Sequence, residues 1–436
     1  MNIRIGLEVA AIALALAAPA AAFAKAPPPA VEADRAARLR MEVFDQVWSQ
    51  IDALYYDPGF NGADWSAARA RYRPRVAGVR DDAAFGSLLR AMVGELRDAH
   101  TRVLTARQAA ERRARQTSSA GVILFEVDGR PAVFSVRPGS PAAEAGVRPG
   151  LTVLAVGGLP VDEALARAKA EVGASSSERA ARVLAYLELI AGAPGDLLRL
   201  RLSGADGTPF EVALPRRPVD TAPRFESRRL PSGDLYVRFD RFRAPVARLF
   251  RAALEQAPVS GLVLDLRSNT GGDGGEGMKA IAPLLDRPMV VARLATRTGK
   301  APSALMGLVK LPLELKAGKR EGRVHSGPVV ILVNEGSAST TEVIAAGLQE
   351  HGRARIVGTR SCGCALGVLK HRKLKDGRTL AISEVGLVSG LGRRIEGEGV
   401  VPDLVVAPTL ADLREGKDPA LDAAVAELKA MRARTR

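Results

Sequence analysis

A repeated pattern between residues 234 and 410 constrains this fold most strongly: a short apolar run is followed by a turn and then by a helix. The runs are nearly continuous in Val, Ile and Leu, and they occupy residues 235–239, 262–266, 329–333, 355–358 and 380–385. Strands covered by helices on both faces read this way, because neither face meets water. The pattern predicts an α/β core with a largely buried sheet over residues 222–410, followed by a C-terminal helix within 411–436.

Two further parts precede this core. Within residues 32–117, apolar side chains recur at three- and four-residue spacing over 43–55 and 85–96, which predicts an N-terminal helical region. Residues 118–218 instead contain short β-like runs between glycine and proline turns, at 122–127, 132–136, 151–156, 197–202 and 210–214. We therefore expect a mixed, multi-domain α/β chain with a small β-rich domain between two helix-containing parts.

The first 24 residues have the composition of a secretory signal peptide. Arg4 precedes an Ala/Leu-rich stretch, and small residues stand at Ala22 and Ala24 before Lys25. A membrane anchor is the alternative, but the apolar run is shorter than the roughly 20 residues of a spanning helix and contains Pro19. We expect export to the periplasm or cell envelope, cleavage after Ala24 and no integral membrane span.

Charge and cysteine content narrow the class of ligand. The formal net charge is +15, which favours anionic envelope polymers or acidic substrates. No aromatic–basic platform accompanies it, so we expect no nucleic-acid partner.

The two cysteines, Cys362 and Cys364, cannot form a disulfide framework, and a redox pair ranks last because it would close a very small ring. The four histidines lack metal-ligand spacing, so we expect no metal and no cofactor.

A candidate nucleophile follows the run at 329–333. There the sequence enters a turn rich in Ser and Thr and then a helix, which presents a small hydroxyl group at a helix N-terminus. Ser337, Ser339, Thr340 and Thr341 could each be a simple helix cap. A second block, Leu264-Asp-Leu-Arg-Ser-Asn-Thr-Gly-Gly272, is a strand that runs into a glycine turn, where the backbone can approach closely.

Together these two blocks resemble the C-terminal-processing (tail-specific) serine peptidases. The resemblance continues through residues 351–358, 397–403 and 96–101. It implies that Ser339 is the nucleophile, that the N–H groups of Gly272 and Thr340 form the oxyanion hole, and that Ser337 and Thr341 are structural. Protein or peptide substrates are implied as partners, whereas the oligomeric state is not indicated.

One departure from that family concerns the catalytic base. Many members use a lysine 25 positions after the serine, and Cys364 stands at that position here. The tricorn-core-like branch instead uses a histidine from an Asp-x-His-Thr segment and a glutamate near a Gly-Val-x-Pro-Asp motif. This chain has Asp98-Ala-His-Thr101 and Glu396, so the resemblance implies His100 as the base and Glu396 as its partner.

The identity of that glutamate is open at this point. Glu398 is the rival of Glu396, and either could be an ordinary surface carboxylate. In some relatives a serine beside the histidine bridges to the glutamate. Ala99 lacks a hydroxyl group, so we expect a direct or water-mediated contact.

Residues 137–158 resemble a bacterial PDZ domain, with Ser140 expected to cap a short helix. In this resemblance Ala120, Gly121 and Val122 lie in the loop that binds a peptide's terminal carboxylate, while helical periodicity over 162–195 predicts an insert that could cover the groove. The sequence thus predicts an exported serine endopeptidase that acts through an acyl-enzyme and engages substrate C-termini. The alternative is a catalytically inactive homologue that serves as a peptide-binding scaffold in the cell envelope.

Overall fold

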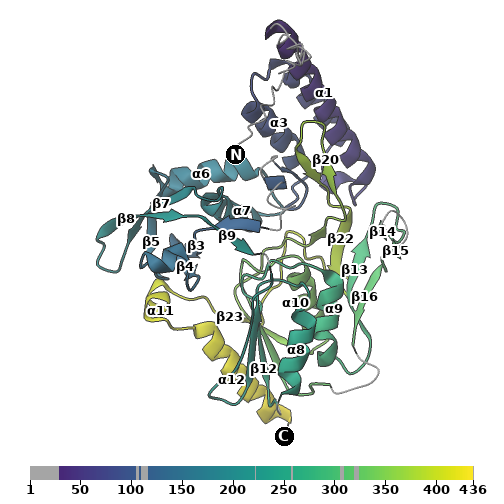
Figure 1. Ribbon diagram of the computed structural model, residues 1–436. Coiled ribbons are helices and arrows are strands. Elements are labelled where there is room, and N and C mark those ends of the chain that lie inside the picture. Colours follow the sequence, from purple (N-terminus) through teal and green to yellow (C-terminus); the bar gives the residue numbers. More distant parts are fainter. Residues whose placement is uncertain are drawn as a thin grey trace, which may run out of the picture.

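The computed structural model describes residues 29–104, 108–109, 116–220, 222–256, 259–304, 309–318 and 324–435. The expected signal peptide lies outside these ranges. Figure 1 shows a helical region at the top, a β-rich domain at the left and an α/β core at the lower right. Within the described residues, no helix has the length and apolar character to cross a membrane.

A six-stranded sheet forms the centre of the core. Its strand order is β10-β11-β12-β17-β18-β23, parallel except for the antiparallel edge strand β10. The strands span Phe225–Arg229, Leu235–Phe239, Leu262–Asp265, Val329–Val333, Arg355–Gly358 and Leu404–Val405, respectively. Parallel neighbours need crossover connections, and the predicted helices supply them. The predicted α/β core is confirmed.

Helices cover both faces of this sheet, which explains the near-continuous apolar runs. Ile331 and Val333 point toward α8 (Val246–Glu255), α9 (Gly274–Ile281), η3 (Ala282–Leu284) and α10 (Thr340–Glu350). Val330 and Leu332 point the other way, against Ala424 of α12 (Pro419–Thr435). Because the central strand β17 is buried on both sides, it has no exposed residue.

The predicted strand at 380–385 is wrong as a core strand. The chain bends at Ser383, whose N–H donates to Thr101 Oγ1, and the run divides between two other sheets. One half, β21 (Thr379–Ala381), joins β1 (Arg102–Leu104) and β20 (His371–Lys373). The other, β22 (Val385–Ser389), joins β19 (Leu366–Gly367), β13 (Met289–Ala295) and β16 (Glu314–Ala317). A short ribbon of β14 (Ser303–Ala304) and β15 (Val309–Lys310) lies apart from them.

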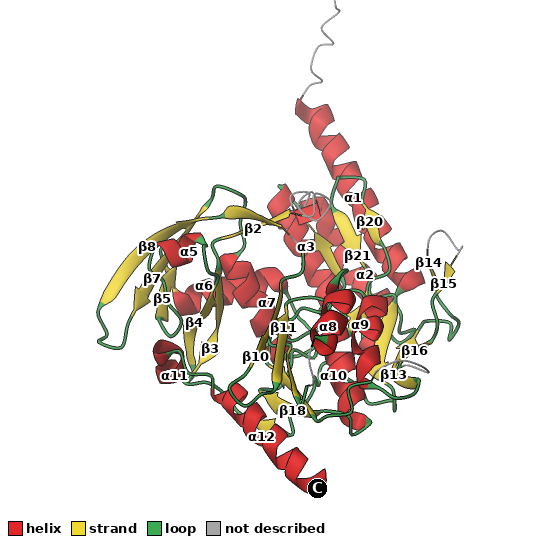
Figure 2. Ribbon diagram, turned by 60° about the horizontal axis from the view of Figure 1, so that its bottom comes forward, coloured by secondary structure: helices red, strands yellow, loops and turns green. Residues whose placement is uncertain are grey.

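The N-terminal helical region packs onto the first of these sheets. Helix α1 (Pro29–Leu54), which projects from the molecule in Figure 2, runs beside α2 (Trp65–Tyr72) and α3 (Asp82–Gly94), with η1 (Phe60–Gly62) and η2 (Arg73–Gly78) between them. Phe44, Trp65 and Phe85 share one buried cluster with Val103 and Leu380. The strand that follows His100 is therefore anchored by a hydrophobic core of its own.

The β-rich domain is inserted between the helical region and the core. Its entry and exit strands, β2 (Gln116–Ser119) and β9 (Arg217–Asp220), pair with each other. Between them lies a sheet of β3 (Val122–Val127), β4 (Arg130–Val136), β5 (Thr152–Val156), β7 (Leu197–Ser203) and β8 (Pro209–Pro215), with β6 (Leu159–Pro160) paired to β5. Helices α6 (Val161–Val172) and α7 (Glu178–Ile190) form the predicted insert, and α11 (Leu410–Glu415) packs against this domain from the C-terminal side.

Candidate active site

Ser339 lies in a sharp turn between strand β17 and helix α10. Its backbone has φ 59° and ψ −125°, a region that residues other than glycine rarely occupy. The turn is held from both sides: Ser337 Oγ donates to the Leu266 carbonyl at 2.8 Å, and the Ser339 N–H donates to the Cys364 carbonyl at 2.8 Å. This strand–turn–helix geometry presents the serine side chain at the start of α10, as in the nucleophile elbows of serine hydrolases.

The glycine turn of the second motif packs directly against this elbow. Gly271 has φ +86°, and a Cβ placed on it would lie 2.7 Å from Ser339 Cβ and 2.9 Å from the Thr340 nitrogen. Thr340 Oγ1 also donates to the Gly272 carbonyl at 2.8 Å. The two residues predicted to form the oxyanion hole are therefore neighbours, beside the N-terminus of a helix whose dipole favours negative charge.

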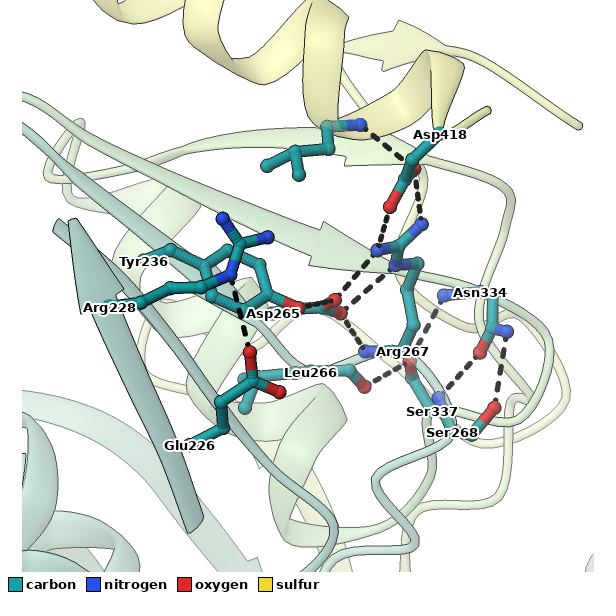
Figure 3. A network of polar contacts seen from close by, with 11 residues as sticks. Glu226, Arg228, Tyr236, Asp265, Leu266, Arg267, Ser268, Asn334, Ser337 and Asp418 are labelled. Carbon is teal, nitrogen blue, oxygen red and sulfur yellow. Dashed lines mark hydrogen bonds and ion pairs between the residues drawn. The ribbon is translucent and has the colours of Figure 1, made fainter. Parts of the chain in front are cut away.

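A buried ion-pair network fixes the strand that leads into this glycine turn (Figure 3). Arg267 binds Asp265 and also Asp418, which precedes α12, each at 2.7 Å. Burial alone would raise the pKa of Asp265, but the Arg267 guanidinium lowers it to about 2. The next residue, Ser268, donates its N–H to Asn334 Oδ1 at 2.7 Å, so the network joins the ends of β12 and β17.

The histidine segment folds around a carboxylate. Asp98 Oδ1 accepts the N–H of His100 at 2.6 Å and that of Thr101 at 3.2 Å. Burial lowers the pKa of His100 to about 4, so the ring is neutral at ordinary pH. Among the described residues, His100 makes no hydrogen bond to Ser339 or Glu396, and its Nδ1 atom is without a partner.

A small buried cluster connects the histidine segment to the segment that carries Ser339. Ala99 packs with Ala180, Cys362 and Cys364, and Ala338 contacts the same cluster. Ala99, which precedes His100, and Ala338, which precedes Ser339, therefore belong to the same hydrophobic cluster, although they are far apart in the sequence. Catalytic hydrogen bonds are often long or absent without substrate. The missing hydrogen bond between His100 and Ser339 is therefore compatible with a role of His100 as the base.

Of the two candidate glutamates, Glu396 is buried and Glu398 is exposed. Glu396 accepts hydrogen bonds from the Ala365 N–H and from the Ser176 hydroxyl group. Ser176 Oγ in turn accepts the Ala99 N–H at 3.1 Å. Burial, reinforced by the charge of Asp98, raises the pKa of Glu396 to about 8.

The expectation of a direct or water-mediated contact to Glu396 missed Ser176. This serine stands in the connection between α6 and α7, and its hydroxyl group links the histidine segment to the glutamate. In the sequence it is one of three consecutive serines before a helix, and Ser177 is the one that caps α7, accepting the Ala180 N–H at 3.1 Å. Nothing in the local sequence distinguishes a bridging serine from a capping one.

A second missed residue is Glu342, in the first turn of α10. Its buried carboxylate accepts the N–H groups of Gly363, Cys364 and Ser339 at 2.7, 2.9 and 3.1 Å. Burial raises its pKa, while these donors oppose that shift. Glu342 therefore ties the turn that contains Gly363 and Cys364 to Ser339.

The structure joins Cys362 and Cys364 by a disulfide, which the sequence reasoning ranked last. Glu342 gathers the backbone of the turn, and Gly363 has φ +76°, so the chain reverses sharply there. The two Cα atoms are consequently 5.3 Å apart, within the usual range for a disulfide.

Through Arg179, the helical insert also contacts two core segments near Glu396, one at Ser361 and one at Glu398. Arg179 Nε donates to the Ser361 carbonyl at 2.6 Å, and its Nη2 donates to the Glu398 carbonyl at 2.8 Å. Arg179 and Ser176 flank the start of α7, so the β-rich domain supplies groups that hold the surroundings of Glu396. The helical insert, expected as a possible cover of a peptide groove, thus reaches the core.

In the predicted carboxylate-binding loop, the Ala120 carbonyl accepts the Ala142 N–H at 3.0 Å and the Gly121 carbonyl accepts the Arg137 N–H at 2.8 Å. The Gly121 N–H donates to Ser119 Oγ at 2.9 Å. Ser140 caps α5 (Pro141–Glu144) as predicted, accepting the Ala143 N–H at 3.3 Å. Strand β3, which begins at Val122, is an edge strand of its sheet.

Sequence comparisons agree with this arrangement. Residues 235–406 match peptidase family S41, and residues 37–94 match the tricorn protease C1 domain. Carboxyl-terminal-processing peptidase 3 of Arabidopsis thaliana is 28% identical over 389 residues, covering 84% of this chain and 69% of that protein. The carboxyl-terminal-processing protease of Synechocystis is 26% identical over 397 residues, covering 86% and 83%.

A tricorn protease homologue of Streptomyces coelicolor is 28% identical over 419 residues, but this chain spans only 32% of its length. Among solved structures, the photosystem II D1 C-terminal processing protease superposes with a TM-score of 0.59 at 25% identity, covering 85% of this chain and 93% of that one. Mature CPAF superposes with a TM-score of 0.65 at 15% identity, covering 91% and 98%, a likeness of fold. The chain is a serine-type peptidase whose residues 235–406 match family S41, and it is similar in sequence and fold to the C-terminal-processing peptidases.

Proposed function

We propose that this peptidase cleaves protein substrates through an acyl-enzyme on Ser339. The observation that carries the proposal is the strained elbow of Ser339, packed so closely on Gly271 that no side chain fits between them. A nucleophile held in such a conformation is pre-organised for attack on a carbonyl carbon. The N–H groups of Gly272 and Thr340 are the proposed donors to the oxyanion that this attack creates.

His100 is the proposed base. Because burial keeps the pKa of His100 near 4, its ring is neutral and able to accept the Ser339 proton. It would then return that proton to the leaving amine, and the cycle would be repeated with water. We assign Glu396 to stabilise the transient imidazolium, with Ser176 as the positioning residue that links the glutamate to the histidine segment.

The compartment and the mode of substrate capture belong to the same proposal. The leader at residues 1–24 supports export to the periplasm or cell envelope. The free edge of β3 and the adjacent loop support capture of an extended peptide by strand addition, with Ala120, Gly121 and Val122 near its C-terminus. The substrates would then be proteins with accessible C-terminal tails.

The test is proteolysis of a denatured protein, with the fragments identified by mass spectrometry. Ser339→Ala should abolish cleavage, and His100→Ala should lower turnover by about three to six orders of magnitude. Cys364→Ala should retain most of the activity, because Glu342 binds the backbone N–H of residue 364 and not its sulfur atom. Loss of activity in Cys364→Ala together with an active His100→Ala would refute the assignment of the base.

A further inference from the structure

Helix α11 belongs to a segment that leaves the core, contacts the β-rich domain and returns to the core. This C-terminal clip, residues 406–418, begins after the edge strand β23, where the Val406 N–H donates to the Gly358 carbonyl at 2.9 Å. It ends at Asp418, which binds Arg267 of the core at 2.7 Å. In Figure 1, α11 lies below β3 and β4, at the upper end of α12. Both ends of the clip are therefore fixed to the core.

The contact between the clip and the β-rich domain has an apolar centre. Leu410, the first residue of α11, is buried in one cluster with Val127 and Ala132, and Leu413 packs against the same cluster. Val127 is the last residue of β3, and Ala132 belongs to β4. Removing these side chains from water favours the docked arrangement of the two parts.

Polar contacts fix the position of this docking. The Leu410 N–H donates to Asp128 Oδ2 at 2.8 Å, and Arg414 Nε donates to the Gly150 carbonyl at 2.9 Å. Gly150 has φ +83°, and a Cβ placed on it would lie 2.9 Å from both the Leu410 carbonyl oxygen and the Arg414 backbone nitrogen. The clip therefore packs on Gly150 so closely that there is no room for a side chain.

Strand β3 connects this contact to the helical insert. Val127 lies against the clip, and Phe125, two residues earlier, packs edge-on against Tyr186 of α7, with ring centroids 6.5 Å apart. Phe125 and Tyr186 both belong to the buried core of the β-rich domain. Because such cores are closely packed, a displacement of β3 is transmitted to α7 rather than absorbed.

The start of α7 is where the β-rich domain reaches the candidate site. There Ser176 Oγ accepts the Ala99 N–H and donates to Glu396. A hydrogen bond is lost when its donor and acceptor move more than about 3.5 Å apart. The link through Ser176 therefore depends on the position of the whole β-rich domain, which the clip holds from the side of β3 and β4.

We propose that the C-terminal clip is a positioning element for catalysis: by fixing the β-rich domain on the core, it keeps the Ser176 hydroxyl group on Glu396. The inference rests on the proposed function, because it takes the role of Glu396 and Ser176 from there. It adds that residues 410–414, which contact the β-rich domain at residues 127–132 and at Gly150, control the rate of the reaction through Ser176.

The first test places a side chain in the contact from the β-rich side. Gly150→Ala puts a Cβ against the backbone of α11, whereas Gly146→Ala is the matched control, because its φ of +75° is similar but no atom lies within 4 Å. The substrate is a short fluorogenic peptide with an amidated C-terminus. Gly150→Ala should lower kcat about 10- to 100-fold with little change in KM, the range expected for loss of the Ser176 hydrogen bond. Gly146→Ala should keep the kcat of the parent.

The same contact can be broken from the clip side. Leu410→Asp puts a charge into the apolar cluster, and Ala411→Asp, at an exposed position of the same helix, is its control. Leu410→Asp should lower kcat as Gly150→Ala does, while Leu410→Met should restore most of the rate. Thermal unfolding checks that each variant is folded, so either substitution decides if the other prevents folding.

A double variant asks whether the clip acts through Ser176. If it does, adding Gly150→Ala to Ser176→Ala should lower kcat by less than about threefold further, because the hydrogen bond is already lost. Independent effects would instead multiply.

Hydrogen exchange of the Ala99 amide reports the docking without any cleavage, because this N–H donates to Ser176 Oγ. It should exchange at least about tenfold faster in Gly150→Ala than in Gly146→Ala. Parent values of kcat in both clip variants, losses that multiply with that of Ser176→Ala, or unchanged exchange at Ala99 would overturn the inference. Since exchange does not require activity, it decides the role of the clip even if Ser339 proves not to be the nucleophile.

Discussion

The hydroxyl group of Ser176 donates a hydrogen bond to Glu396, a residue 220 positions further along the chain. One belongs to the helical insert of the β-rich domain and the other to a loop of the peptidase core. Because Ser176 also accepts the Ala99 N–H, a single side chain joins the domain that precedes the core, the histidine segment and the glutamate. The surroundings of the proposed base are therefore complete only when the β-rich domain is docked.

Ser176→Ala should lower kcat by about 10- to 100-fold with little change in KM, since a lost hydrogen bond to an ionisable group is worth roughly 1.5–3 kcal/mol. Ser177→Ala is the matched control. Ser177 caps α7, so its loss should cost about 1 kcal/mol in the free energy of unfolding and leave kcat near the parent value. Equal kcat values for Ser176→Ala and the parent would remove Ser176 from the relay, and Ser176→Thr should restore part of the rate.

Activity should rise as pH increases from 7 to 9. The pKa of His100 is about 4, so its neutral form is already present at pH 7, whereas Glu396, with a pKa of about 8, ionises only in this range. An ionised Glu396 stabilises the imidazolium that forms during catalysis. The kcat/KM profile of the parent should therefore have a midpoint near pH 8, and Glu396→Gln should be slower and flat there. A midpoint that persists in Glu396→Gln would assign the ionisation to another group.

Gly271→Ala should eliminate most of the activity. The new Cβ would lie 2.7 Å from Ser339 Cβ and from the Ala338 carbonyl, both part of the turn that positions Ser339, the proposed nucleophile. Gly299→Ala provides the control, because its φ of +66° is equally unfavourable for alanine but no atom lies within 4 Å. It should cost about 1 kcal/mol of stability and leave kcat unchanged. Comparable losses of kcat in both variants would mean that backbone strain, rather than contact with Ser339, decides the result.

Arg267→Ala should destabilise the protein by about 3–5 kcal/mol, because it leaves the buried Asp265 carboxylate without its partner. Arg293→Ala breaks an exposed pair with Glu314 and should cost about 1 kcal/mol or less. Urea denaturation of both variants measures the difference. If the two losses are equal, the network in Figure 3 does not stabilise the strand end before the glycine turn.

The core could be predicted from the sequence because its strands are buried on both faces. The runs at 235–239, 329–333 and 355–358 are strands with those bounds, and most of their residues are apolar and buried. The run at 380–385 is equally apolar, but Leu380 is buried against the helical region and Val385 lies in another sheet. Its bend depends on the bond from Ser383 to Thr101, which no local pattern reveals.

Some residues of the candidate site could likewise be predicted from the sequence, and others could not. The resemblance of two motifs to the C-terminal-processing peptidases implied that Gly272 and Ser339 share a site, and the structure places the adjacent Gly271 directly against Ser339. Ser176 and Arg179 could not be predicted, because their partners lie about 200 residues away, where neither spacing nor periodicity carries information. Glu342 also binds the backbone of the turn that contains Cys364. In the sequence alone, Glu342 is an ordinary residue in the first turn of a helix.

The most direct test of the account is the covalent labelling of the full chain by a fluorophosphonate, with the modified residue identified by peptide mass spectrometry. We predict a single adduct on Ser339, none in Ser339→Ala, and labelling that is about a thousandfold or more slower in His100→Ala. An adduct on a different serine, or a labelling rate that His100→Ala does not change, would contradict the proposed nucleophile and its base.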